Sequence, residues 1–242
     1  ERQIFMSAAV DLIKSHPAPF RLLEIGSYAG SSLLTWANAA ENFLDGECHI
    51  TCVDPWGESG ADLYNSNMTK TLISERAYQV FCHNASLNRE NVRVTPMRGT
   101  SSDILPTFEP NSFNLIYIDG NHHYADVLHD IVESAKLLKS GGIICGDDLE
   151  FQLFQCEQEF VENNKTADFI KEPKSGELFH PGVTLAVAEY FGEVSNFAGF
   201  WAMQKSSNGF EKISLNEATG LRPPIWPREF HKRITAYFED SD

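Results

Sequence analysis

Apolar runs and segments of helical periodicity alternate along the chain up to Glu150. Short apolar runs bounded by turn-forming residues predict strands, and apolar residues repeated every three or four positions predict helices. The expected strands are Arg21–Ile25, His49–Val53, Val92–Met97, Phe113–Ile118 and Ile143–Cys145. The expected helices are Ser31–Phe43, Asn67–Cys82 and Tyr124–Lys139. Strands and helices that alternate with short connections predict an α/β fold, a doubly wound, Rossmann-like sheet of seven mostly parallel strands with helices on both faces.

The pattern weakens beyond Glu150. It indicates a helix at Gln152–Asn163, a loop at Lys171–Gly176, a helix at Val183–Phe191 and a strand at Phe197–Gln204. The tail from Ser214 combines an extended, proline-rich segment with a last short helix.

We therefore predict one domain at residues 1–205 and a C-terminal extension at 206–242. An insertion at 151–179 follows the fifth strand and is expected to form a lid or a substrate wall. A structural arm or a dimer contact are the alternatives for this insertion. The aromatic tail Trp226–Phe238 is a candidate interface of a homo-oligomer.

Charge and composition narrow the class of protein. The net charge of −15 repels phosphate backbones, so we expect a small-molecule substrate and no nucleic acid. No apolar run reaches the roughly 20 residues of a membrane helix, and the first residues are not typical of a signal peptide. Five cysteines without zinc-site spacing predict reduced, mostly buried thiols and a cytoplasmic protein.

The first strand runs into a glycine-containing loop, Glu24-Ile25-Gly26-Ser27-Tyr28-Ala29-Gly30. Its glycines allow a sharp turn and close approach to a ligand, but their spacing is not that of dinucleotide-binding proteins. The pattern E-x-G-x-x-x-G resembles the first motif of class I S-adenosylmethionine (SAM)-dependent methyltransferases, whose loop passes the methionine part of SAM. The resemblance implies cofactor contacts from Glu24, Gly26, Ser27, Tyr28 and Gly30; a plain strand-turn-helix joint is the alternative.

The next two strands also end in polar residues. Asp54, at the tip of the second strand, is positioned to accept hydrogen bonds from ribose hydroxyls, or it merely forms a turn before a proline. Trp56 is a candidate for covering the adenine face, with surface packing as the alternative. After the third strand, Thr100 and Ser101 are the candidates for a turn along the adenine ring, or for an ordinary helix N-cap.

Three acids follow the fourth and fifth strands. Asp119 ends one strand, and Asp147 and Asp148 end the other. Neighbouring parallel strands lie about 4.8 Å apart, so these carboxylates are expected to converge at the edge where ligands bind. Crowded carboxylates repel one another unless a cation joins them, and oxygen ligands favour Mg²⁺ or another hard divalent cation. The alternative is that the acids only cap turns.

The sequence around these acids resembles one methyltransferase family. The runs Tyr117–Tyr124 and Gly141–Asp148 are similar to the macrocin-type O-methyltransferases, methyltransferase domain family 24, over roughly Leu22–Asp148 and more loosely His180–Lys205. That family includes metal-dependent methyltransferases of antibiotic sugars. The resemblance implies that Asp119, Asp147 and Asp148 hold Mg²⁺, that Asp119 also contacts the cofactor, and that the metal grips substrate hydroxyls.

One position departs from that pattern. Several relatives carry an acidic general base where this chain has Asn121, and an amide cannot take up a proton at neutral pH. His122 and His123 are the candidates for the base, since histidine titrates near neutrality. A base from elsewhere, or a reaction that needs none, stays open.

We therefore expect a SAM-dependent methyltransferase that transfers a methyl group to a hydroxyl of a small molecule, with Mg²⁺ as a second cofactor. Three alternatives remain. The first is a metal-independent methyltransferase. The second is an NAD-linked oxidoreductase, which the glycine spacing disfavours. The third is a SAM-binding protein without catalytic activity.

Overall fold

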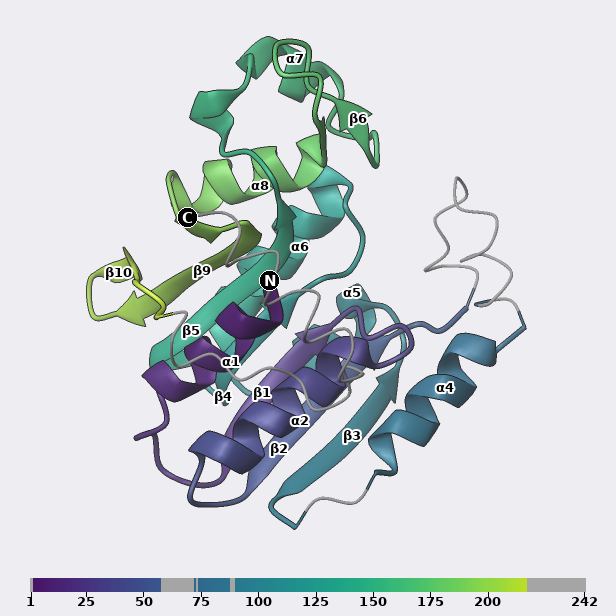
Figure 1. The fold of residues 1–242 in the computed structure, drawn as a ribbon, viewed down its shortest axis with the longest axis vertical. Helices are drawn as coiled ribbons and strands as arrows, with labels where there is room; N and C mark the ends of the chain where they lie inside the picture. The colour runs from purple at the N-terminus through teal and green to yellow at the C-terminus, as the bar shows by residue number, and fades with distance from the viewer. Residues whose placement is uncertain (1, 58–71, 73, 88–89, 217–242) are drawn as a thin grey trace, which may run out of the picture.

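The computed structural model describes residues 2–57, 72, 74–87 and 90–216, and an α/β sheet organises them (Figure 1). Within these residues the main sheet has eight strands. Seven follow the order β10-β9-β5-β4-β1-β2-β3, and β8 pairs with β9 beside this path. The strands are β1 Phe20–Ile25, β2 Cys48–Asp54, β3 Val92–Arg98, β4 Phe113–Ile118, β5 Leu138–Leu149, β8 Ser195–Phe197, β9 Gly199–Ser206 and β10 Gly209–Lys212. Strands β1 to β5 are parallel and the last three antiparallel, which confirms the predicted fold class.

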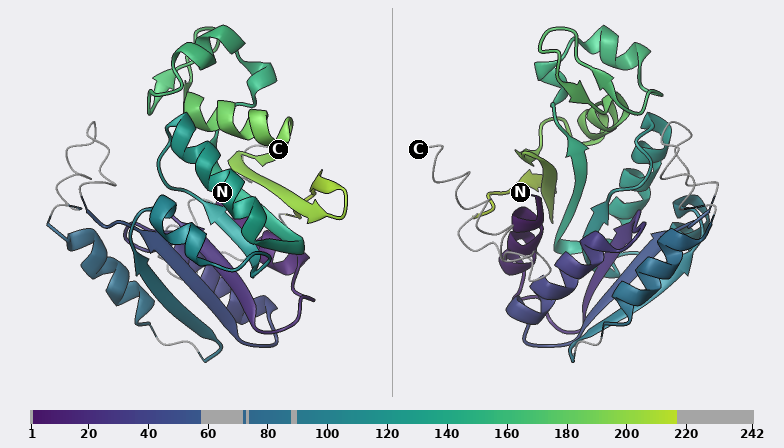
Figure 2. Two further views of the ribbon diagram at one scale, coloured as in Figure 1. Left: turned by 180° about the vertical axis from the view of Figure 1, so that it is seen from behind. Right: turned by 45° about the vertical axis from the view of Figure 1, so that its right-hand side comes forward.

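Helices cover both faces of the sheet. Helices α1 and α2 pack with Phe81 of α4 over one face, in front of the sheet in Figure 1. Helices α6 and α8 form a second core with the other face, and α6 lies in front when the molecule is turned by 180° (Figure 2). The described helices are α1 Arg2–Leu12, α2 Ser31–Phe43, α4 Arg76–Ala85, α5 Ser101–Ile104, α6 Tyr124–Leu137, α7 Gln158–Asn163 and α8 Pro181–Phe191.

The boundary between α6 and β5 differs from the prediction. The helix ends at Leu137 rather than Lys139, and the strand begins at once with Leu138. Its pairing with β4 shifts register just before Ile143. Two glycines permit this bulge: Gly141 has φ +78°, and a Cβ on Gly142 would lie 2.6 Å from the Asn114 carbonyl oxygen. The glycines therefore shape a strand instead of ending a helix.

The insertion forms a small unit beyond the end of β5, at the top of Figure 1. The predicted helix at 152–163 is a 3₁₀ turn, η3 Leu153–Gln155, followed by α7. The predicted loop lies in a two-stranded hairpin of β6 Ile170–Lys171 and β7 Leu178–Phe179. Val161, Phe179 and Leu185 form the centre of its own apolar cluster, which joins it to α8.

Helix α1 was not predicted, although its apolar residues had helical spacing. Phe5, Ala9 and Ile13 recur every four residues and are buried. Strand β10 lies beyond residue 205, so the sheet continues into the predicted extension. The proposed interface at Trp226–Phe238, and most of the predicted helix ahead of Arg76, lie outside the described residues.

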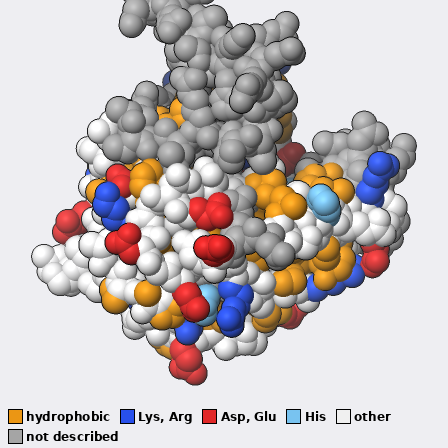
Figure 3. Space-filling view, turned by 60° about the horizontal axis from the view of Figure 1, so that its bottom comes forward, with side chains coloured by type: hydrophobic (Ala, Val, Ile, Leu, Met, Phe, Trp, Pro, Cys, Tyr) orange, Lys and Arg blue, Asp and Glu red, His pale blue; other side chains and the backbone are white. Residues whose placement is uncertain are grey.

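All five cysteines are free thiols, and Cys48, Cys52 and Cys145 are buried, as predicted. Within the described ranges, no helix has both the length and the apolar character needed to span a bilayer. On the face seen in Figure 3, acidic and basic side chains are mixed with hydrophobic ones, so the described part of this face carries no continuous basic surface.

Candidate active site

The glycine loop lies against the end of β4. Gly26 has φ +84°, and a Cβ there would come 1.9 Å from the Asp119 carbonyl oxygen. The Gly26 N–H also donates to the Val53 carbonyl at the end of β2. Only glycine combines this backbone angle with this contact. The loop therefore joins the carboxyl ends of β1, β2 and β4.

Glu24 lies in the core beneath the glycine loop and hydrogen-bonds it. It is fully buried, and its Oε2 accepts a 2.6 Å hydrogen bond from the Ser27 hydroxyl and a contact from the Cys52 thiol. Burial raises the pKa of Glu24. Its other oxygen, Oε1, is buried without a hydrogen-bond partner in the described part of the molecule.

Asp54 holds the loop in shape. Its carboxylate accepts backbone N–H bonds from Ser27 at 3.0 Å, Tyr28 at 2.8 Å and Trp56 at 2.7 Å. Burial raises the pKa of Asp54, and these hydrogen bonds oppose the shift. These contacts organise the turn that the sequence suggested as the alternative. The ribose contact stays a prediction.

Trp56 is packed into the core. Its ring lies 4.5 Å from that of Phe81, its indole N–H donates to the Tyr28 carbonyl, and it is fully buried. The structure thus places Trp56 beneath the loop. This burial contradicts the surface-packing alternative. The contact with the adenine face stays a prediction.

The turn after β3 begins α5. Thr100 is its N-cap: the hydroxyl oxygen accepts from the Asp103 N–H at 3.3 Å. Ser101 hydrogen-bonds Asp130, a buried carboxylate of α6 whose pKa burial raises to about 7. The N-cap alternative therefore holds for Thr100. The adenine contacts of Thr100 and Ser101 stay predictions.

The three acids line one small cavity, with Asn121, His122 and Trp201 among its other walls. Burial raises the pKa of Asp119 to about 7, and repulsion from Asp148 adds to this. Asp148 has φ +63°, a backbone strain that is common where a side chain must be aimed at a site.

Arg2 reaches into this cluster from α1. Its guanidinium pairs with Asp147 and lies 3.7 Å from Asp119 Oδ2. The Tyr117 hydroxyl donates to the same Asp119 oxygen at 2.9 Å. The structure therefore sets a fixed positive charge between two of the predicted metal ligands.

His122 bridges the sheet and the insertion. Its Nε2 lies 3.1 Å from Asp148 and its Nδ1 lies 2.6 Å from Asp168. Burial lowers the pKa of His122, but the two carboxylates outweigh it and raise the pKa to about 9. His122 is therefore an imidazolium at neutral pH in this arrangement.

His180 extends the network at the start of α8. Its Nδ1 lies 3.0 Å from Glu150, and its ring lies 4.3 Å from that of His122. On its other side the ring of Phe169 stacks at 4.6 Å. The insertion thus contributes the carboxylate of Asp168 and the ring of Phe169 to the edge of the site.

Asn121 caps the helix that follows. It accepts from the His123 N–H at 3.1 Å and donates to Asp126 at 2.8 Å, while His123 is the N-cap of α6. Of the two candidate bases, the structure places His122 beside the acids. Asn121 has a structural role at this position.

The part of the chain that carries this site matches a known protein family. Residues 23–149, from β1 to the end of β5, match the model of a family described as a methyltransferase domain. The chain belongs to this methyltransferase family. The match covers the glycine loop and all three acids of the methyltransferase domain.

Three similar proteins match this chain at low identity, and NovP shares its fold. The O-methyltransferase NovP is 16% identical, with a TM-score of 0.55, over 85% of this chain and 79% of its own. A Corynebacterium glutamicum protein is 14% identical, with a TM-score of 0.49, over 84% and 79%. The uncharacterized protein y4gI of Sinorhizobium fredii (strain NBRC 101917 / NGR234) is 29% identical over 135 residues, 54% of this chain. That match spans only 13% of y4gI.

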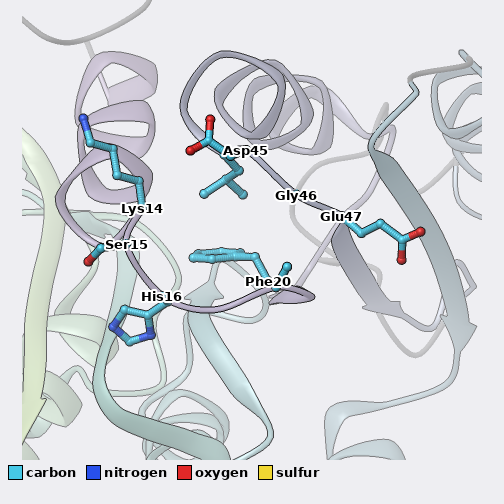
Figure 4. A pocket seen from close by; sticks show the side chains of 9 residues that line it. Lys14, Ser15, His16, Phe20, Asp45, Gly46 and Glu47 are labelled. Carbon is cyan, nitrogen blue, oxygen red and sulfur yellow. The ribbon is translucent and has the colours of Figure 1, made fainter.

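A larger cavity of the methyltransferase domain lies away from these residues. It measures about 320 Å³ and is lined by the connections that lead into β1 and β2, including Lys14, His16, Phe20 and Asp45 (Figure 4). These residues stand at the amino ends of the strands. In open α/β sheets ligands bind at the carboxyl ends, so the small acidic cavity is the candidate active site.

Sequence reasoning missed four residues of the site: Arg2, Glu150, Asp168 and His180. Arg2 belongs to a helix that the prediction left out. The other three come from the insertion or its borders, where the pattern was weak. Tyr117, by contrast, could have been predicted to lie near the site, because it precedes Asp119 by two residues on a predicted strand.

Proposed function

We propose that this chain is a SAM-dependent O-methyltransferase that acts on a hydroxyl of a small molecule with the help of a divalent cation. One observation carries the proposal: the glycine loop and the three acids meet at the carboxyl ends of β1, β4 and β5, with Gly26 against Asp119. The family match supports methyl transfer, and the name of NovP supports oxygen as the acceptor atom.

The loop fits SAM. Gly26 and Gly30 both have positive φ, which lets the loop turn tightly beside the end of β4. The unpartnered Glu24 Oε1 and the carboxylate of Asp119 suit the positive charges of the cofactor. When bound, SAM supplies a methyl group on a sulfonium and leaves as S-adenosylhomocysteine. Asp54 would hold the loop in the conformation that binds the ribose.

The acids fit a divalent cation. Asp119 and Asp148 each have an oxygen within 4.8 Å of a His122 nitrogen and of each other, and Asp147 lines the same cavity. We propose Asp119, Asp147 and Asp148 as ligands of Mg²⁺ or another hard divalent cation. Such an ion would acidify and orient the acceptor hydroxyl.

His122 is the proposed site of proton transfer. Its ring lies beside Asp148 and is held in orientation by Asp168. It accepts a proton only in its neutral form. Loss of its interaction with Asp148, which raises its pKa, would favour that form. Catalysis otherwise depends on alignment and on exclusion of water.

The insertion is the proposed wall of the acceptor site. Asp168 contacts His122, and Phe169 stacks on His180, so the insertion closes directly over the acids. A small-molecule acceptor with a hydroxyl near a ring fits this mixture of charge and aromatic surface. The net charge of −15 argues against nucleic acid as the acceptor.

A metal-independent methyltransferase is the second candidate, and Arg2 favours it. The structure already pairs Asp147 with Arg2 and Asp148 with His122. The side chains of Arg2 and His122 would then neutralise the charge of the acids, and hydrogen bonds alone would orient the acceptor.

Titration with Mn²⁺ and Mg²⁺ separates the two candidates. We expect calorimetric binding to the wild type that Asp148→Asn abolishes and that Asp45→Asn, an exposed change at the opposite pole, leaves intact. Binding that survives Asp148→Asn, or no binding even with S-adenosylhomocysteine present, would favour the metal-independent enzyme.

Formation of S-adenosylhomocysteine tests the reaction itself. The protein would be incubated with SAM and a panel of sugars and aromatic diols, each paired with its deoxy analogue. The proposal predicts product with a hydroxylated acceptor and none with the analogue that lacks the hydroxyl. Turnover of amines alone would contradict O-methylation.

A further inference from the structure

Helix α1 places a guanidinium at the carboxyl ends of the strands. Phe5, Met6 and Ala9 fix the helix in the core, and the ring of Phe5 stacks on Phe197 at 4.9 Å. Arg2 is the first residue of this anchored helix. Its side chain keeps 40% exposure while it contacts Asp147.

Negative groups surround this side chain. Arg2 pairs with Asp147 and lies close to Asp119, and the carboxyl groups of Asp148 and Glu24 act on it as well. An arginine guanidinium is charged at any physiological pH.

The charge pattern of SAM makes this position important. Its amino-acid part carries an ammonium and a carboxylate beside the sulfonium. Glu24 and Asp119 suit the two positive groups, but they repel the carboxylate. Among the described residues, Arg2 is the Arg or Lys side chain that forms salt bridges with the acids of this cavity.

We propose that Arg2 binds the carboxylate of SAM, an inference that rests on the proposed function. The planar guanidinium offers paired N–H donors that match a carboxylate. In this structure they meet Asp147, and the carboxylate of the cofactor would accept them in its place. Arg2 would thus discriminate SAM and S-adenosylhomocysteine from adenosine derivatives that lack the amino-acid part.

The test compares two ligands by calorimetry. S-adenosylhomocysteine has the amino-acid part, and 5′-methylthioadenosine lacks it. We expect Arg2→Gln to weaken binding of the first by roughly tenfold or more and to leave the second unchanged. Arg2→Lys keeps the charge but not the paired donors. Its affinity for S-adenosylhomocysteine is expected to lie between those of the wild type and Arg2→Gln. Lys14→Ala, which removes a positive charge at the far end of the domain, should change neither affinity.

Equal losses for both ligands in Arg2→Gln, or an unchanged affinity for S-adenosylhomocysteine, would overturn the inference. If the wild type binds neither ligand, the proposed function fails, and this inference fails with it.

Discussion

At the scale of single residues, Gly26 sets the distance between the glycine loop and β4. Gly26→Ala adds both a disfavoured backbone angle and a clash with the Asp119 carbonyl, so we expect a loss of roughly 2–4 kcal/mol in unfolding free energy. Gly176 is the matched control, since its φ is +73° and a Cβ there would meet nothing within 4 Å. Gly176→Ala should cost about 1 kcal/mol. Urea unfolding would measure both, and equal costs would contradict the close contact.

Asp130 gives a prediction about pH. Burial raises its pKa from 3.8 to about 7, so the folded protein holds a proton that the unfolded chain releases. Stability from this group is therefore lost as pH rises from about 4 to 7. Asp130→Asn, which resembles the protonated form, should gain roughly 2 kcal/mol relative to the wild type between pH 5 and pH 8. Exposed Asp45→Asn is the control. A difference that does not change with pH would contradict the buried, protonated carboxyl.

The acids could be predicted from sequence because each ends a strand that is itself easy to recognise. Asp119 follows a fully buried strand, and Asp147 and Asp148 lie near the end of another, so their shared location depends only on the parallel sheet. Their partners could not be predicted in this way. Arg2 reaches the acids, and Asp168 reaches His122, through tertiary packing of distant elements, which no local pattern records.

At the scale of elements, the short hydrogen bond between Asp168 and His122 is one of several contacts that join the insertion to the rest of the domain, beside the Tyr124 N–H bond to the Lys165 carbonyl and the packing of Phe179. Asp168→Ala should loosen residues 158–179 and leave β4 and β5 unchanged. Hydrogen exchange should therefore increase several-fold in the insertion alone. Glu162→Ala, which removes an exposed acid of α7, is the control. Unchanged exchange in Asp168→Ala would show that the bond does not hold the insertion.

Most elements that belong to the main cores were predicted well, and those of the insertion poorly. Helix α2 and strand β4 match their predicted ranges, because each is an apolar segment bounded by polar or turn-forming residues. The short pieces of the insertion lack such a period, since their small core is shared among α7, β7 and α8. Strand β5 was expected only in part, because its first residues pair with β4 ahead of a bulge.

At the scale of the molecule, the parallel sheet brings ends of β1, β2, β4 and β5 together, and this gathers the loop and the acids into one site. The alternation of strands and helices was sufficient to predict that arrangement. It was not sufficient to predict that α1 and the insertion approach the same edge from opposite faces. Those two elements supply Arg2 and Asp168 to the site.

The central claim is that the glycine loop binds SAM. The most direct measurement is calorimetric titration of SAM and of NAD into the wild-type protein, with Gly26→Ala and Gly176→Ala alongside. The account predicts a SAM dissociation constant in the micromolar range that Gly26→Ala removes and Gly176→Ala preserves, and no binding of NAD. Binding of NAD, or no binding of SAM to the wild type, would contradict it.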